Sequence, residues 1–325
     1  MEKSDGFFRF IELFSLQSAL YFSKTKILMK NYFFLFLYVL AMLVTSCSTI
    51  KENENSIYIT PQQDWQKWKT EYQQELRSND GWLSLVGLYW LKEGDNSIGS
   101  ANTNQHKFPK GTPKKFGQIN ISNNVITFTR ASDKILINDK NIRSQKLILN
   151  KTIVSFDTYS FYVIKREKGF AIRLQSSANP AITNFKGTKF YPYNKSLRIP
   201  ARLIKPDSSK KIAIKTVYQT VRQDDFAGWL ELEYQGKLIR LKAVSYGDKY
   251  PMSVMFVDET SQETTYGAGR YLDVEWPKNG ERTIIDFNYA YNPPCAFTKF
   301  ATCPLPPQSN RLDFSVDAGE LFEEH

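Results

Sequence analysis

The pattern of apolar and polar positions divides the chain into an apolar N-terminal stretch, one helical segment and a long series of short strands. The apolar stretch spans 32–43 without a charge, about the length of a signal-peptide core and too short for a comfortable membrane-spanning helix. Further along, Trp65, Trp68, Tyr72 and Leu76 recur at helical spacing. This periodicity predicts one amphipathic helix, whose tryptophan stripe we expect to pack against a sheet.

The predicted helix has a start signal at its N-terminal end and a stop signal at its C-terminal end. Thr60 can cap its first turn, Pro61 suits the first helical position, and Gln63 stands at the capping-box position. The turn-forming run Asn79-Asp80-Gly81 predicts the end of the helix.

The chain after the helix has the character of a β protein. Short runs of β-branched and aromatic residues alternate with turn residues, and 229–234 and 237–242 alternate strictly between apolar and charged side chains. Hairpin turns are predicted at Asn123-Asn124, Asp139-Lys140, Lys168-Gly169 and Gln235-Gly236. The predicted fold is mainly β, with antiparallel sandwich or barrel units and one N-terminal amphipathic helix.

The same patterns predict four segments. They are a signal peptide over 1–46, a lipidated tether over 47–60, a helix plus N-terminal β subdomain over 61–180, and a C-terminal β subdomain over 181–325. Because secretory signals usually span about 15–30 residues, Met29 is a better start than Met1.

Cys47 closes the apolar run after Val44-Thr45-Ser46 and resembles the lipidated cysteine of a bacterial lipobox. A lipidated N-terminus with several acyl chains anchors a protein stably. The sequence therefore predicts a lipid-anchored protein of the cell envelope that meets the membrane through its anchor. Ser48 rather than Asp follows the cysteine, which favours the outer membrane.

Charge and histidine content exclude several classes of protein. The net charge is +10, but the basic residues are scattered, so nucleic acid is not a predicted partner. The chain has only His106 and His325, which disfavours histidine-rich zinc sites and histidine-dependent triads. No phosphate loop or dinucleotide motif is present in the sequence, and we expect neither a metal nor a cofactor.

Cys295 and Cys303 are the remaining cysteines. In an exported protein two such residues predict a disulfide that closes a short loop. A buried inert pair and a reactive thiol at Cys295 are the alternatives.

The most specific sequence lies in the C-terminal half, at 258–272, 285–298 and 301–312. It includes Asn-Pro-Pro-Cys-Ala-Phe-Thr at 292–298 and Ala-Thr-Cys-Pro-Leu-Pro-Pro at 301–307. This signature resembles that of an uncharacterised bacterial family of unknown function, and the resemblance extends from about residue 81 to residue 319. It implies no activity.

The five prolines of this signature loop prevent it from pairing as an interior strand. One interpretation is a plug over an edge of the β unit, with Phe297, Phe300 and Leu305 as buried anchors. The other is a stiff wall of a ligand cleft.

Candidate functional side chains also gather in the C-terminal half. Paired acids could act as general acid and base on a glycoside, and the catalytic candidates are Asp258, Glu259, Glu263 and Asp286, with Asp273 nearby. Candidate binding residues are Arg270, Asn288, Tyr291 and Asn292. The structural alternative is that Asp258 opens a turn and Arg270 pairs with a nearby acid.

Two functions from different classes fit these features. The first is an envelope protein that binds a small molecule or glycan through aromatic faces beside Asn, Asp and Arg. The alternative is an envelope hydrolase that uses Asp and Glu residues of the C-terminal half. A purely structural envelope role remains a third interpretation. In the first half, 98–100, 118–128 and 135–139 weakly resemble a forkhead-associated sandwich, without clear counterparts of its phosphopeptide-binding residues.

Overall fold

The computed structural model describes residues 60–208 and 210–323, which belong to one compact unit beginning at Thr60. The predicted signal peptide, the start at Met29 and the lipidated Cys47 lie outside the described residues. Within the described ranges, no helix combines the length and apolarity that crossing a membrane requires.

The described chain contains few helices and many strands. The helices are α2 (Pro61–Leu76) and α3 (Pro180–Asn184), with short 3-10 turns at η1 (Trp82–Ser84), η2 (Lys195–Leu197), η3 (Phe287–Tyr289), η4 (Pro294–Ala296) and η5 (Gln308–Asn310). The strands before α3 are β1 (Leu85–Trp90), β2 (Gly94–Gly99), β3 (His106–Lys107), β4 (Gly117–Ser122), β5 (Val125–Arg130), β6 (Leu136–Ile137), β7 (Ser144–Lys146), β8 (Val154–Phe156), β9 (Tyr159–Arg166) and β10 (Gly169–Ser176). Those after α3 are β11 (Arg198–Ile204), β12 (Lys211–Lys215), β13 (Val221–Tyr234), β14 (Lys237–Ser245), β15 (Met252–Phe256), β16 (Arg270–Val274) and β17 (Arg282–Asp286).

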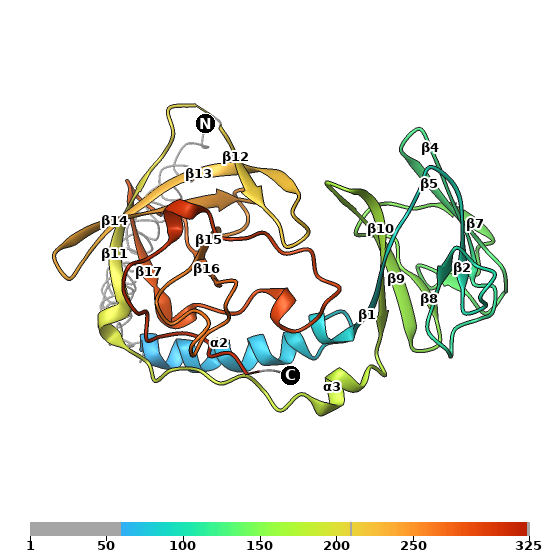
Figure 1. The fold of residues 1–325 in the computed structure, drawn as a ribbon, viewed down its shortest axis with the longest axis horizontal. Helices are drawn as coiled ribbons and strands as arrows, with labels where there is room; N and C mark the ends of the chain where they lie inside the picture. Colours follow the sequence, from blue (N-terminus) through green and yellow to red (C-terminus); the bar gives the residue numbers. More distant parts are fainter. Residues whose placement is uncertain (1–59, 209, 324–325) are drawn as a thin grey trace, which may run out of the picture. The chain divides into compact units, whose positions relative to one another are not determined.

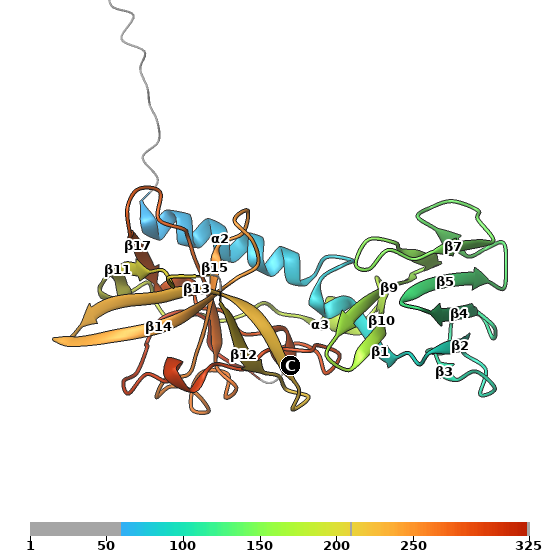
Figure 2. The same cartoon turned by 90° about the horizontal axis from the view of Figure 1, so that it is seen from above.

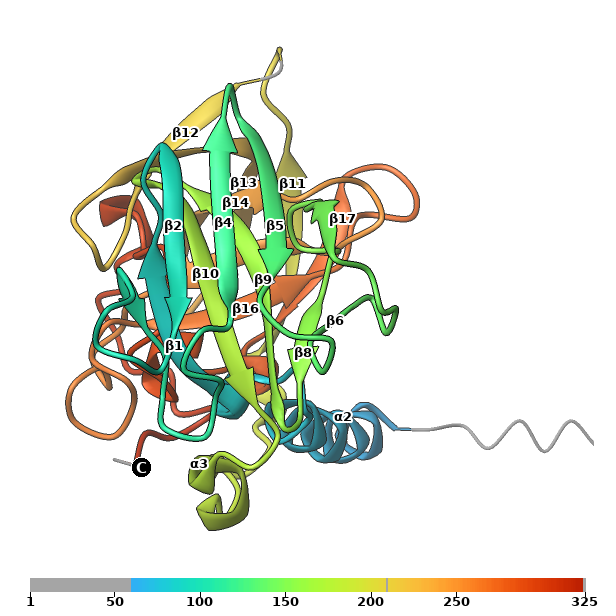
Figure 3. The same ribbon diagram turned by 90° about the vertical axis from the view of Figure 1, so that its right-hand side faces the viewer.

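Strands β1 to β10 form a sandwich of two five-stranded sheets. One sheet has the order β1-β10-β9-β8-β6 and the other β3-β2-β4-β5-β7. Figure 3 shows β2, β4 and β5 in one layer and β9 and β10 in the other. Aromatic and aliphatic side chains from both sheets, including Phe128 and Phe161, share one buried core. Of the described strands in this sandwich, β2 and β3 pair in parallel and the others pair antiparallel.

Two-residue turns close the hairpins because Asn, Asp, Gln and Gly tolerate positive φ angles. Asn123 and Asn124 have φ angles of 50° and 63°, and the turn Gln235-Gly236 has 50° and 74°. These two turns confirm the sequence prediction. A third turn lies at Asn138-Asp139, one residue before the predicted Asp139-Lys140, since Asn adopts the left-handed region more readily than Lys.

The β9–β10 hairpin shows the same shift. Arg166 pairs with Gly169, so the turn residues are Glu167 and Lys168 rather than the predicted Lys168-Gly169.

The C-terminal strands form one antiparallel seven-stranded sheet. Its order is β16-β15-β14-β13-β11-β17, and β12 pairs with β13. Figure 2 shows β13 and β14 as a long hairpin, and their alternation matches the prediction for 229–234 and 237–242. With the sandwich and α2, this sheet confirms the mainly β fold with one N-terminal helix.

Helix α2 packs against the C-terminal part of the chain, as Figure 1 shows. Thr60 and Gln63 form the predicted capping box. The Trp65 indole is 2% exposed and donates from Nε1 to the Asn288 carbonyl at 2.7 Å. Tyr289 Oη donates to the Asp64 carboxylate at 2.9 Å. Trp65 is therefore buried as predicted, but its ring contacts are with Phe190 and Tyr193, which lie outside the strands of the sheet.

Glu320 joins α2 to two other segments. Its carboxylate oxygen Oε2 accepts hydrogen bonds from Tyr72 Oη at 3.0 Å and from the Asn292 backbone N–H at 2.6 Å. Its backbone N–H donates to Ala290, and it bridges to Phe190. The side chain is fully buried without an ion-pair partner among the described residues. Burial raises the pKa of Glu320 to about 8, against smaller opposing effects of Asn292, Tyr72 and Arg270.

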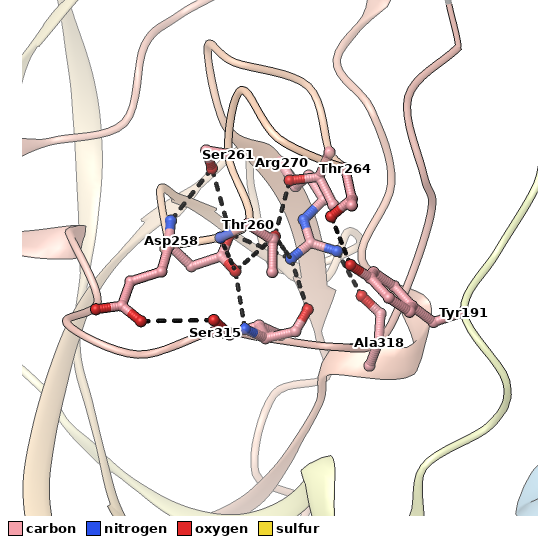
Figure 4. Close-up of polar contacts among 11 residues, drawn as sticks. Tyr191, Asp258, Thr260, Ser261, Thr264, Arg270, Ser315 and Ala318 are labelled. Carbon is pink, nitrogen blue, oxygen red and sulfur yellow. Dashed lines mark hydrogen bonds and ion pairs between the residues drawn. The ribbon is translucent and has the colours of Figure 1, made fainter.

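Asp258 and Arg270 form a fully buried ion pair at 3.2 Å, which Figure 4 shows. Arg270 also donates to the Val316 carbonyl at 3.0 Å and to the Ala318 carbonyl. Asp258 accepts from the Val316 N–H at 2.8 Å and from Thr260 Oγ1 at 2.8 Å. The pair therefore holds the segment before Glu320 onto the β15–β16 region.

Replacement of Asp258 by Asn tests this role. The substitution leaves the buried Arg270 guanidinium without a counter-charge, and we expect it to lower the free energy of unfolding by about 3–5 kcal/mol. Urea denaturation of residues 48–325 measures the change.

The control is Glu263→Gln, which neutralises an exposed carboxylate and should change stability by less than about 0.5 kcal/mol. Equal stability of the Asp258→Asn and Glu263→Gln variants would show that the ion pair does not hold the segment.

Candidate functional site

The structure does not gather the four catalytic candidates into one cavity. Asp258 is inaccessible in its ion pair with Arg270. Glu259 and Glu263 are exposed. Asp286 is half-buried and caps η3, where its Oδ1 accepts from the Asn288 N–H at 3.1 Å. Each of these acids has a separate environment.

Three of the four binding candidates hold the backbone in place. Arg270 is fully buried beside Asp258. Asn288 exchanges side-chain hydrogen bonds with the backbone of Asn194 at 2.7 and 2.9 Å. Asn292 donates from Nδ2 to the Leu321 carbonyl at 3.0 Å. These contacts favour the structural interpretation of the three residues.

The fourth, Tyr291, lines a cavity of about 670 Å³ between α2 and the C-terminal sheet, which we name the aromatic pocket. Its wall from α2 and the following turn consists of Trp68, Glu71, Tyr72, Glu75, Leu76 and Trp82. The remaining wall consists of Arg222, Tyr246, Tyr250, Pro251, Ser253, Tyr271, Asp273, Tyr291, Pro294 and Pro304. Segments far apart in the sequence thus meet around one cavity.

Aromatic rings dominate this pocket. Trp68 and Tyr72 stack with their ring centroids 5.4 Å apart and an interplanar angle of 9°. The Tyr72 ring lies 5.8 Å from that of Tyr291, which lies 6.0 Å from that of Tyr271. Tyr271 is fixed by donating from Oη to the Pro304 carbonyl at 2.6 Å. The rings therefore hold one another in place before any ligand arrives.

A few polar groups interrupt the aromatic lining. Asp273 Oδ2 accepts from Tyr291 Oη at 3.3 Å. Asp273 is exposed within the cavity. Partial removal from water raises its pKa, the Tyr291 hydrogen bond opposes this, and Glu275 and Glu75 raise it further. Arg222 donates from Nε to Asp224 at 2.6 Å. The pocket thus offers carboxyl groups, phenol hydroxyls and one guanidinium.

The aromatic pocket contains residues that sequence reasoning missed. Trp68 and Tyr72 are half-buried, unlike Trp65, and their predicted role was core packing. The available signal was an aromatic stripe that continues through two more helical turns beyond the buried Trp65.

The signature loop lines the aromatic pocket, but the three anchors predicted for a plug are not buried. Phe297, Phe300 and Leu305, expected as buried anchors, are only half-buried. The loop is instead fixed by buried Ala301, Thr302 and Cys303, small side chains that fit close to the neighbouring backbone. Pro294 and Pro304 line the aromatic pocket, as the cleft-wall interpretation requires.

Cys295 and Cys303 are adjacent free thiols in the structure. The Cys295 backbone N–H donates to Cys303 Sγ at 3.1 Å. The hydrogen bond between the two side chains lowers the pKa of Cys295 and raises that of Cys303. A disulfide between them remains a prediction.

The described residues contain no group of three or more His, Cys, Asp or Glu side chains arranged to hold a metal ion.

Comparisons with known proteins identify one domain. Residues 183–321 match the family described as "Protein of unknown function (DUF1684)". These residues include the C-terminal sheet and the signature loop, and the signature as a family hallmark remains a prediction. No curated protein matches the chain.

Solved structures show weak similarity. An uncharacterized protein of Haloarcula marismortui, solved by solution NMR, is 26% identical, with 43% of this chain and 78% of that chain covered and a TM-score of 0.37. The FHA domain of FhaA, complexed with the intracellular domain of Rv3910, is 18% identical, with 27% and 86% covered and a TM-score of 0.19. TM-scores this low do not establish a shared fold. The family match is the stronger finding, and residues 183–321 form a DUF1684 domain of unknown function.

Proposed function

We propose that this chain is a lipid-anchored protein of the cell envelope that binds a small molecule or glycan in the aromatic pocket. The observation that carries the proposal is the convergence of stacked aromatic rings and a few polar groups around one cavity. Its volume of about 670 Å³ lies within the range of about 300–1,000 Å³ typical of ligand sites.

The lining suits a sugar ring or another flat, partly apolar ligand. The Trp68 and Tyr72 rings offer apolar area for the C–H face of a sugar. Asp273, Ser253 and the tyrosine hydroxyls offer hydrogen-bonding groups for its hydroxyls. Because the rings already contact one another, little side-chain ordering opposes binding.

The lipid anchor follows from the sequence around Cys47. In a bacterium that processes lipoproteins, the full chain should incorporate a fatty-acid label, and the Cys47→Ser variant should not. The Cys295→Ser variant is the matched control and should retain the label. Equal labelling of the Cys47→Ser variant and the unsubstituted chain would contradict the anchor.

A thermal-shift screen of residues 48–325 against glycans, peptidoglycan fragments and common metabolites tests ligand binding. A ligand at one hundred times its Kd adds about 2.7 kcal/mol, and each kcal/mol raises the Tm by roughly 2–4 °C for a chain of this size. We expect Trp68→Ala to weaken binding of the best ligand at least about tenfold, which is about 1.4 kcal/mol.

Trp229→Ala is the control, because this half-buried tryptophan lies on β13 outside the aromatic pocket. It should leave the Kd unchanged. A ligand whose Kd is unaffected by Trp68→Ala, or a folded protein that binds nothing in the screen, would contradict the proposed site.

An envelope hydrolase is the second candidate, and the raised pKa of Asp273 in the pocket favours it. A raised pKa favours the protonated form that a general acid needs, and Glu75 provides a second carboxyl. Product analysis separates the candidates. Recovery of the bound ligand unchanged supports binding, whereas cleavage that Asp273→Asn abolishes while binding persists supports hydrolysis.

A further inference from the structure

Two arginine side chains that do not line the aromatic pocket converge on a single hydroxyl group. Arg166 Nε donates to Thr302 Oγ1 at 3.0 Å, and Arg173 Nη2 donates to the same oxygen at 3.3 Å. Neither guanidinium has a carboxylate within ion-pair distance in the described part of the chain. Two like charges therefore share one neutral acceptor.

Arg173 is the more unusual of the two. Its side chain is buried, with the residue 6% exposed, and its Nε atom has no hydrogen-bond partner in the structure. Its guanidinium lies over the ring of Trp82 at 4.9 Å. A buried cation with an unused donor is costly unless an anion compensates it.

Arg222 links this cluster to the aromatic pocket. It lines that pocket and also a second cavity of about 620 Å³, which Arg166 and Lys165 line as well. Proximity of Arg173 and Arg222 helps to lower the pKa of Arg166, after burial as the main cause. The like charges thus lie close enough to repel one another.

Two carboxylates, those of Glu167 and Asp224, line the second cavity with Lys165, Arg166 and Arg222. Asp224 pairs with Arg222 at 2.6 Å, and Glu167 accepts from Thr220 at 3.4 Å. Glu71 and Glu75 belong to α2, which lines only the aromatic pocket. Positive charge therefore remains in excess on the side of the second cavity.

We propose that Arg166, Arg173 and Arg222 bind an anionic group, a carboxylate or a phosphate ester, on the ligand of the aromatic pocket. The preferred ligand is an acidic saccharide. The inference that the rest of this ligand is a sugar rests on the proposed function. Guanidinium groups suit this role because they offer several donors to a planar carboxylate or a phosphate.

Calorimetric titration of residues 48–325 with glucose, glucuronic acid, glucose 6-phosphate and inorganic phosphate tests the inference. We expect at least one of the two acidic sugars to bind at least tenfold tighter than glucose, and inorganic phosphate to bind on its own. Comparison of glucuronic acid with glucose 6-phosphate distinguishes the two anionic groups.

Arg166→Gln and Arg173→Lys should each weaken binding of the acidic sugar at least fivefold and leave the Kd of glucose unchanged. Arg166 is half-buried, so its variant keeps the test valid if Arg173→Lys fails to fold. Arg240→Gln, on β14 and outside both cavities, is the matched control.

Equal affinity for glucose and both acidic sugars, or acidic-sugar binding that neither arginine variant weakens, would overturn the anionic site and leave the proposed function standing. Phosphate binding that Arg166→Gln abolishes, with no sugar bound, would support the anionic site and contradict the proposed function. Absence of any binding to the folded protein would overturn both.

Discussion

The aromatic pocket depends on one buried carboxyl group, that of Glu320. Its Oε2 atom accepts from Tyr72 on α2 and from the backbone of Asn292 at the start of the signature loop. The helix and the loop supply two walls of the pocket, so this single oxygen fixes their separation. Within 60–208 and 210–323, no cation at ion-pair distance compensates the carboxyl. Its raised pKa keeps the proton on the folded protein, which avoids burying an uncompensated charge.

Three buried ionisable side chains differ in how their charge is compensated. Glu320 is accommodated by taking up a proton, and Asp258 is accommodated by the opposite charge of Arg270. Arg173 is compensated in neither way, since arginine keeps its proton and no acid among the described residues lies within ion-pair distance of it. The charge of the first two is compensated without a ligand, although Glu320 Oε1 and Arg270 Nε also lack hydrogen-bond partners among the described residues. The charge of Arg173 is not compensated, and its guanidinium lies over Trp82, which lines the aromatic pocket.

Local features of the fold could be predicted from the sequence because local residues determine them. The Thr60 capping box, the Asn123-Asn124 turn and the alternation along β13 and β14 depend on neighbouring side chains. The site could not be predicted, because it combines segments whose contacts are set by tertiary packing. Asp258 and Asp273 are similar acids in the sequence, yet one neutralises a buried arginine and the other faces the pocket.

The pH dependence of stability tests the central role of Glu320 most directly. The folded pKa of about 8 exceeds the unfolded value of 4.5, so only the unfolded chain releases the proton between these values. The contribution of Glu320 to the free energy of unfolding is therefore largest below pH 4.5. It decreases as the pH rises to about 8, by at most about 1.4 kcal/mol per pH unit. Glu320→Gln keeps an acceptor for Tyr72 and Asn292 but cannot titrate. We expect the free energy of unfolding of this variant to increase relative to that of the unsubstituted protein as the pH rises from 5 to 8. A constant difference between the two proteins across that range would contradict a buried, protonated Glu320.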